Sequence, residues 1–264
     1  MIKLIASDID GTLIPYGETE LPRDLFPLIH RLREAGVLFC PASGRQYHSL
    51  RGIFAPVAGE LCFLAENGAI VYGPNPREED APILARTPMP RGEALALSRA
   101  IADLPGCQLL VSGDNTSYIW RGTREYKEYL LKDKGNNVKE VTGVEELPRE
   151  ILKVSAYCPG GTDGPQKALG PQWGHLGMAA AGPDWVDFTL ADKGTGIRDL
   201  CKALGIAPQE VAAFGDNWND EAMLRAVGQP WLMDTAHPDL RAQFPRQCSS
   251  VTAVLEGMLA ELEK

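Results

Sequence analysis

Four short apolar runs, each ending abruptly in polar or glycine residues, constrain the fold more than any other feature of the sequence. They occupy residues 2–7, 37–40, 61–64 and 211–214. Continuous apolar runs of this length are typical of strands that are buried on both faces, as in a parallel sheet. The sequence therefore predicts several buried strands whose carboxyl ends carry polar side chains.

Segments with helical spacing of apolar residues lie between these runs. They cover residues 25–35, 197–204 and 222–227, and a glycine follows each one directly. Glycine is a common stop just beyond a helix. The alternation of strands and helices predicts an α/β fold with a doubly wound, mostly parallel sheet. Ligands of such sheets bind beyond the carboxyl ends of the strands, where the polar clusters of this sequence fall.

The middle of the chain has a different pattern. Residues 73–82 are rich in proline and charge and are typical of a linker, and the segment after them alternates less clearly. The weaker alternation continues to about residue 188, and the strand–helix rhythm returns after Asp192. We therefore expect a core domain formed by residues 1–82 and 189–264, interrupted by an inserted domain at 83–188, which has a common domain size.

Composition excludes several classes of protein. With 26 Lys and Arg against 35 Asp and Glu, the net charge is −9, which disfavours binding to nucleic acid or to anionic membranes. No stretch approaches the roughly 20 apolar residues of a membrane span, and the run at 2–6 is too short for a signal peptide. The six cysteines are scattered without a C-x-x-C pair, as expected of reduced thiols. We expect a cytoplasmic monomer or weak homo-oligomer.

The first polar cluster contains two carboxylates, Asp8 and Asp10, followed by Gly11 and Thr12. Acids two residues apart at the end of a buried strand repel each other, and a divalent cation between them would relieve the repulsion. An acidic surface turn is the simpler alternative. A calcium loop of the EF-hand type is disfavoured, because glycine is fourth rather than sixth.

Two further clusters, around Ser43 and Lys193, each have two interpretations. Ser43 either caps the following helix or, with the amides of Gly44 and Arg45, faces an anion. Lys193 stands at the start of a helix, which is unfavourable for a cation in the field of the helix dipole. That position indicates a function for Lys193, although most lysines are simply solvated.

The fourth cluster, at residues 215–220, contains Asp216, Asn219 and Asp220. A helix cap would explain one of these acids but not all three polar residues. Together the four clusters contain carboxylates, a hydroxyl and an ammonium group. These are the groups required for phosphoryl transfer, which depends on positioning and charge neutralisation.

The order and spacing of these motifs resemble the haloacid dehalogenase superfamily of phosphohydrolases. The matching motifs are Asp-x-Asp-Gly-Thr-Leu at 8–13, Ser-Gly-Arg at 43–45, Lys-Gly-Thr-Gly at 193–196 and Gly-Asp-Asn-x-Asn-Asp at 215–220. The turn at Asn67 and the large insertion are similar to the Cof-like subclass IIB. The resemblance implies a Rossmann-like core with an α/β cap of the C2 type that selects the substrate.

The resemblance also implies a role for each matching residue. Asp8 is the nucleophile and is transiently phosphorylated, and Asp10 is the general acid and base. Asp8, Asp216 and the backbone carbonyl of Asp10 hold Mg²⁺. The expected phosphate-binding residues are Ser43, Gly44, Lys193 and Asn219, and the expected supporting residues are Thr12, Arg45, Asn67 and Asp220.

These roles predict a magnesium-dependent phosphatase of small phosphorylated metabolites, with sugar phosphates as the expected class. A phosphomutase and a phospho-acceptor regulatory domain are the alternatives. Substrate contacts within the cap are expected among its aromatic and basic residues, although each also fits a structural role. These are Tyr118, Trp120, Arg121, Arg124 and Lys127. The sequence departs from the family pattern at Asp234, where relatives often carry asparagine.

Overall fold

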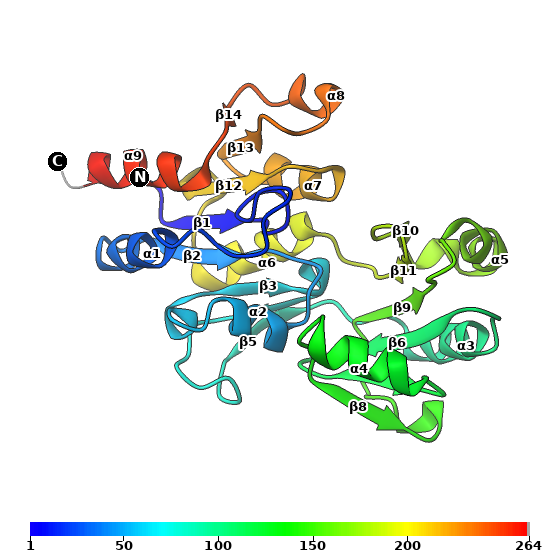
Figure 1. The fold of residues 1–264 in the computed structure, drawn as a ribbon. Coiled ribbons are helices and arrows are strands. Elements are labelled where there is room, and N and C mark those ends of the chain that lie inside the picture. Colours follow the sequence, from blue (N-terminus) through cyan, green and yellow to red (C-terminus); the bar gives the residue numbers. More distant parts are fainter. Residues whose placement is uncertain (263–264) are drawn as a thin grey trace. The chain divides into compact units, whose positions relative to one another are not determined.

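The computed structural model describes residues 1–262, and the chain forms two compact units (Figure 1). The first unit comprises Met1–Gly44, Leu50–Ala85 and the C-terminal part of the chain from Asp192. The second unit comprises Arg45–Ser49 and Arg86–Ala191. The sequence interpretation placed the insertion at 83–188 and did not anticipate the short segment at 45–49.

A five-stranded parallel sheet forms the centre of the first unit. In spatial order, its strands are β14 (Gln247–Cys248), β13 (Gln229–Met233), β12 (Val211–Gly215), β1 (Leu4–Ser7) and β2 (Leu38–Pro41). Nearly every residue of β1, β2 and β12 is buried, as the continuous apolar runs predict.

The register of the three central strands aligns their carboxyl ends. Ser7 of β1 lies opposite Phe214 of β12 on one side and Pro41 of β2 on the other. The residues directly beyond these strands therefore meet at one edge of the sheet. This register brings the polar clusters after β1 and β12 together, although about 200 residues separate them in sequence.

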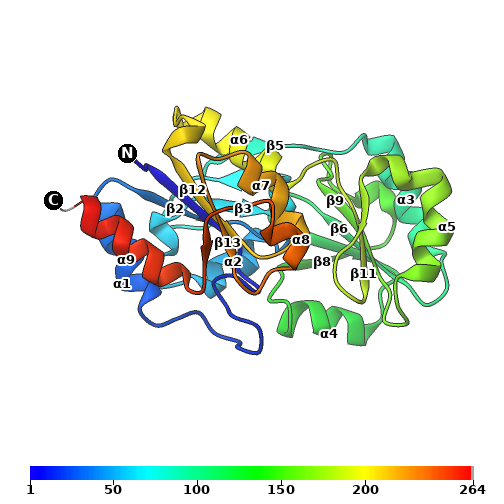
Figure 2. The same cartoon turned by 90° about the horizontal axis from the view of Figure 1, so that it is seen from above.

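Helices cover both faces of this sheet. Successive side chains of a strand point to opposite faces, and Leu4 and Ala6 of β1 join a core cluster with α6 (Lys193–Leu204) and α7 (Glu221–Arg225). On the other face, α1 (Leu25–Glu34) packs beside α9 (Val251–Leu262), as Figure 2 also shows. The short helix α8 (Pro238–Arg241) lies between β13 and β14 in the chain. The predicted doubly wound α/β fold is confirmed.

The run at 61–64 departs from the expected parallel sheet. It contributes to β3 (Phe63–Ala65), which pairs antiparallel with β4 (Ile70–Tyr72) in a three-stranded sheet completed by β5 (Ile83–Arg86). Within residues 1–262, the parallel pairing of this run is limited to a bridge between Ala42 and Leu64. The cause is the turn after β3, in which residues 66–68 all have positive φ angles and reverse the chain.

A six-stranded sheet forms the second unit, in the order β10 (Met178–Ala180), β11 (Trp185–Phe188), β9 (Lys153–Tyr157), β6 (Gln108–Ser112), β7 (Ser117–Trp120) and β8 (Val138–Val141). Its neighbouring strands are antiparallel except β7 and β8. The main apolar cluster joins one face to α3 (Arg91–Ala102) and α5 (Asp163–Trp173). A smaller cluster joins the other face to α4 (Arg124–Lys132).

Hydrogen bonds hold the segment Arg45–Ser49 in the second unit. The Gln46 side chain is buried, and its amide donates to Ser117 Oγ at 3.0 Å and accepts from the backbone N–H of Asn137 at 2.6 Å. Ser49 Oγ donates to the carbonyl of Lys134 at 2.7 Å. Helix α2 (Tyr47–Ile53) therefore begins in one unit and ends in the other.

All six cysteines are free thiols, although Cys107 Sγ and Cys158 Sγ lie 3.1 Å apart. Within residues 1–262, no helix combines the length and apolar character that a membrane crossing requires.

Candidate active site

Asp8 lies immediately beyond β1, at the edge where the central strands end. Its backbone N–H continues the sheet ladder by donating to the carbonyl of Phe214 at 3.0 Å. The residue is only 6% exposed. A buried carboxylate needs partners that compensate for lost hydration, so the groups around Asp8 decide its chemistry.

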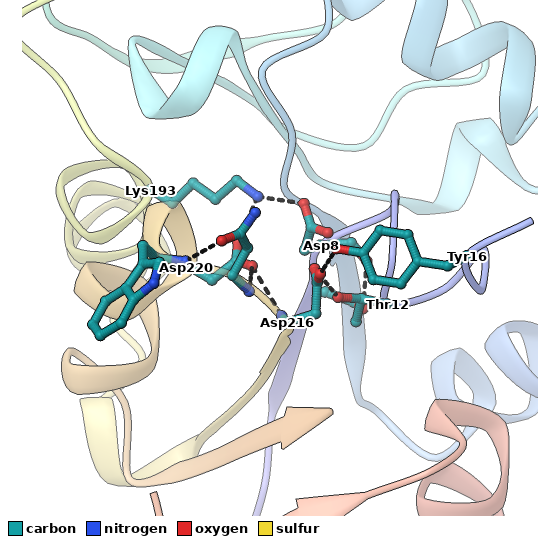
Figure 3. Close-up of polar contacts among 9 residues, drawn as sticks. Asp8, Thr12, Tyr16, Lys193, Asp216 and Asp220 are labelled. Atoms are coloured by element: carbon teal, nitrogen blue, oxygen red, sulfur yellow. Dashed lines mark hydrogen bonds and ion pairs between the residues drawn. The ribbon is translucent and has the colours of Figure 1, made fainter. Parts of the chain in front are cut away.

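Lys193 is the cationic partner of Asp8 (Figure 3). Its ammonium group donates to Asp8 Oδ1 and, at 2.6 Å, to Asp220 Oδ1. Lys193 is the first residue of α6, and Asp192 caps that helix by accepting from the N–H of Thr195 at 2.6 Å. The unfavourable position of Lys193 in the helix dipole is therefore offset by two carboxylates.

Asp220 is held from both of its oxygens. While Oδ1 accepts from Lys193, Oδ2 accepts from the backbone N–H groups of Asp216 and Asn217 at 3.0 and 3.1 Å. Asp220 is completely buried and ends the turn Trp218–Asp220 that precedes α7. These bonds make Asp220 the group that orients Lys193 and closes the loop after β12.

Asp216 follows β12 and faces the loop after β1. Thr12 Oγ1 donates to Asp216 Oδ1 at 3.0 Å, and the Tyr16 hydroxyl donates to Asp216 Oδ2 at 2.5 Å (Figure 3). The hydrogen bond to Asp216, followed by burial, raises the pKa of Tyr16 to about 12. Tyr16 is therefore protonated at neutral pH and acts as the donor in this contact.

Gly11 allows this close arrangement. Its φ angle is +91°, and a Cβ atom placed there would lie 2.4 Å from Asp216 Oδ2 and 2.8 Å from the ring of Tyr16. Any other residue would carry both backbone strain and a steric clash. The glycine of the first motif is thus required by the approach of Asp216 and Tyr16 to the backbone.

The cluster carries an excess of negative charge. Asp8, Asp216 and Asp220 each offer a carboxylate oxygen, and these oxygens lie within 4.8 Å of one another. The ammonium group of Lys193, which pairs with Asp8 and Asp220, balances only one of the three negative charges. Burial raises the pKa of Asp8 to about 7; Lys193 opposes this rise and Asp220 adds to it. Burial also raises the pKa of Asp216. When all four groups are ionised, the formal charge is −2, which one divalent cation balances.

The donor set fits a hard divalent cation such as Mg²⁺. All three acidic side chains offer oxygen ligands, which Mg²⁺ prefers. Asp220 already uses its oxygens for Lys193 and two backbone amides, whereas Asp8 and Asp216 have fewer competing donors. The carboxylates of Asp8 and Asp216 are therefore the better candidates for metal ligands.

Ser43, Gly44 and Asn67 lie together at the end of β2. Ser43 is buried, its N–H donates to the carbonyl of Leu64, and its carbonyl accepts from the N–H of Asn67, both at 2.9 Å. A Cβ atom at Gly44 would lie 3.0 Å from the Asn67 amide, so the two residues pack tightly. The left-handed turn at Asn67 therefore supports the loop that carries Ser43.

Three further predicted site residues, and Asp234, differ in their surroundings. Asp10 is exposed and does not belong to the three-acid cluster found in the described part of the chain. Asn219 is exposed, and no hydrogen bond among residues 1–262 joins it to Lys193. Arg45 belongs to the second unit. Asp234 is exposed, and its backbone N–H pairs with Cys248.

Sequence reasoning missed Tyr16. Pro15 and Gly17 surround it, which is a turn signal, and a turn does form, with the N–H of Glu18 donating to the carbonyl of Pro15 at 3.0 Å. The signal identifies the turn but not the contact with Asp216, which lies 200 residues further along the chain.

Comparisons with known proteins point to one family. The sequence profile of one family, described as haloacid dehalogenase-like hydrolase, matches residues 5–253. The chain is 26% identical over 267 residues to the 5-amino-6-(5-phospho-D-ribitylamino)uracil phosphatase of Escherichia coli K12, and the alignment covers 100% of this chain and 96% of that enzyme.

Solved structures share the fold. A protein of Eubacterium rectale superposes with a TM-score of 0.83 at 29% identity, covering 97% of this chain and 99% of the other. A haloacid dehalogenase subclass IIB sugar phosphatase superposes with a TM-score of 0.76 at 19% identity, covering 99% and 98%. The resemblance inferred from the motifs is confirmed.

Proposed function

The chain belongs to the haloacid dehalogenase-like hydrolases and is a phosphoric monoester hydrolase, and from this premise we propose a mechanism through an aspartyl-phosphate on Asp8 with Mg²⁺ bound. The observation that carries the proposal is the ion pair between Asp8 and Lys193, buried where the central strands end. Asp8 lies beside the ammonium group of Lys193, and Asp216 and Asp220 could share one metal ion with it. These positive charges suit a nucleophile that must accept an anionic phosphoryl group.

In the first step, a carboxylate oxygen of Asp8 attacks phosphorus and forms an acyl-phosphate bond. The bond between phosphorus and the ester oxygen breaks, and Asp10 gives its proton to the leaving alkoxide. Lys193 stabilises the negative charge of the phosphoryl oxygens, since its ammonium group already lies beside Asp8. Ser43 and Gly44 contribute a hydroxyl and backbone amides to the same oxygens.

In the second step, water attacks the phosphorus of the aspartyl-phosphate. Asp10, which is now a carboxylate, accepts a proton from that water. The bond between phosphorus and the Asp8 oxygen breaks, releasing inorganic phosphate and restoring both acids. The exposure of Asp10 supports this role, because the residue can exchange protons with solvent.

Mg²⁺ would be held by the carboxylates of Asp8 and Asp216 and by the backbone carbonyl of Asp10. When bound, it neutralises the repulsion between the nucleophile and the anionic phosphoryl group. The excess negative charge of the three-acid cluster supports this assignment. Thr12 and Asp220 keep the surrounding side chains in place through their hydrogen bonds.

For the substrate, we propose small metabolites that carry phosphate on a hydroxylated carbon chain, such as sugar phosphates. The support is chemical: one relative is named for a phosphorylated ribityl compound, and one structural neighbour is described as a sugar phosphatase. The acidic net charge disfavours larger polyanions such as nucleic acid.

A screen of phosphorylated metabolites with Mg²⁺ tests the proposal, with release of inorganic phosphate as the readout. We expect turnover of sugar or polyol phosphates, and excess EDTA to stop it until Mg²⁺ is restored. Undiminished turnover in EDTA would rule out the metal. Release of phosphate without a bisphosphate activator would exclude a phosphomutase, and a stable phospho-protein without turnover would favour a regulatory domain.

A further inference from the structure

Tyr16 makes a contact that no motif of the sequence explains. The residue is 68% exposed, yet its hydroxyl is anchored on Asp216 at 2.5 Å. An exposed aromatic side chain normally keeps its rotamer freedom, and fixing it has an entropic cost. The hydrogen bond to a carboxylate offsets this cost, because bonds to charged acceptors are stronger than those between neutral groups.

The surrounding backbone is shaped to deliver this hydroxyl. Tyr16 is the second residue of the turn closed by Pro15 and Glu18, and Gly17, with φ at +93°, provides the left-handed position of a type II turn. The missing side chain of Gly11 leaves the space that the Tyr16 ring uses. Gly11, Gly17 and the turn therefore bring the hydroxyl of Tyr16 to the carboxylate of Asp216.

Asp216 thereby has one donor on each oxygen. Thr12 binds Oδ1 and Tyr16 binds Oδ2, so rotation of the carboxylate about its last bond is restricted from both sides. Each carboxylate oxygen has two lone-pair sites, so one donor on an oxygen still leaves a site for a cation. Thr12 is buried and Tyr16 is exposed, which makes Tyr16 the solvent-side partner.

We propose that Tyr16 is a positioning residue that holds the Asp216 carboxylate ready for the divalent cation. The inference rests on the proposed function, because it takes Asp216 as a ligand of the cation. Hydrogen-bonding partners behind metal ligands typically change metal affinity when they are removed. The hydroxyl of Tyr16 therefore sets how tightly the cation binds, whereas Asp8 and Lys193 set the rate of the chemical step.

The test measures cation binding without substrate, using the full chain and Mn²⁺ as the probe. Mn²⁺ shares the preference of Mg²⁺ for oxygen ligands, and the EPR signal of the free ion reports binding directly. We expect Tyr16→Phe, which keeps the ring over Gly11, to weaken Mn²⁺ binding about tenfold. Tyr16→Ala should weaken it equally.

Tyr129→Phe is the matched control, because it removes a tyrosine hydroxyl from the second unit, where Tyr129 stacks on Tyr157. It should leave Mn²⁺ affinity unchanged. Equal or tighter Mn²⁺ binding by Tyr16→Phe would overturn the proposal, as would a loss seen only in Tyr16→Ala. Absence of Mn²⁺ binding to the wild type would overturn both this inference and the metal role. Mn²⁺ binding without phosphatase activity would overturn the proposed function alone.

Discussion

The two units differ in the charged side chains that they bury: the first buries a network of several, and the second buries one ion pair, between Lys153 and Asp187. The first unit buries Asp8, Lys193 and Asp220 in one network where its strands end, and each is less than 10% exposed. The second unit carries the ion pairs of its helices on exposed surface, as between Lys127 and Glu140. Burying charge is costly unless the partners are complete, so a buried network indicates chemistry, whereas exposed pairs contribute little.

The candidate substrate residues of the second unit illustrate the same difference. Each makes a contact within its own unit. Trp120 donates to the carbonyl of Thr142, Arg121 pairs with Asp103, Arg124 pairs with Glu128, Lys127 pairs with Glu140, and Tyr118 lies under the ammonium group of Lys139. These contacts support the structural interpretation of all five residues. Their part in choosing a substrate stays a prediction.

Removing the nucleophile gives the largest expected effect. We expect Asp8→Asn to lower kcat for p-nitrophenyl phosphate by about four orders of magnitude or more, because no other carboxylate can form the acyl-phosphate. The thermal midpoint measures whether the variant folds. Asp103→Asn, an exposed acid of the second unit, is the control and should retain activity. Near-normal turnover by Asp8→Asn would contradict the mechanism.

Lys193→Met should cause the second-largest loss of activity. Losing the phosphoryl-binding ammonium group should lower kcat about 10²- to 10³-fold. The variant also leaves buried carboxylates without a cation, which should cost about 3–5 kcal/mol of unfolding free energy, measured with urea in metal-free buffer. The stability loss should shrink at acidic pH, because protonated carboxyl groups no longer need the lysine.

Asp187→Asn is the control that distinguishes a loss of stability from a loss of catalysis in the Lys193→Met experiment. Asp187 forms the buried ion pair of the second unit with Lys153, with N and O atoms 3.6 Å apart. The variant should destabilise the protein while leaving turnover of p-nitrophenyl phosphate intact. If it lowers turnover as much as Lys193→Met does, the assignment of the chemistry to the first unit alone is wrong.

The pH profile should show a moderate effect. Burial raises the pKa of Asp8 to about 7, and only the ionised carboxylate attacks phosphorus. At low Mg²⁺, kcat/KM should therefore fall about tenfold for each pH unit below neutrality. A bound cation favours the ionised form and lowers this pKa, so saturating Mg²⁺ should move the acid limb to lower pH. A limb that stays in place would contradict Asp8 as a metal ligand.

The smallest effect should come from the exposed surface of the second unit. Lys127→Met removes the ion pair with Glu140. The side chain of Lys127 is 39% exposed and that of Glu140 is 52% exposed. We expect a change in unfolding free energy of less than about 1 kcal/mol and unchanged turnover of p-nitrophenyl phosphate. A loss comparable to that of Lys193→Met would break the contrast between the two units.

Local patterns predicted much of the core. The apolar run at 2–7 contains β1, the run at 211–214 forms β12 except for its last residue, and the glycine stop at Gly205 follows α6 directly. These features depend on neighbouring residues, because burial, helical period and backbone freedom are local properties. The family motifs then identified Asp8, Lys193 and Asp216, which the fold brings to one edge of the sheet.

Other features depend on contacts that a local pattern does not contain. The run at 61–64 has the composition of a parallel strand, but the left-handed turn at Asn67 pairs it with β4 instead. The sequence indicates only a turn at Tyr16, whereas the structure shows its hydroxyl bonded to Asp216. Both cases require the tertiary structure, because a partner distant in sequence determines how the strand pairs and what Tyr16 contacts.

The short segment Arg45–Ser49 limits how the two units can be recombined by engineering. Excising residues 86–191 would leave the Gln46 side chain without Ser117 and Asn137, which satisfy its amide in the intact protein. Ser49 would likewise lose the carbonyl of Lys134. A chimera that transplants the second unit of this protein onto another scaffold must therefore carry two pieces of chain, the long insertion and these five residues.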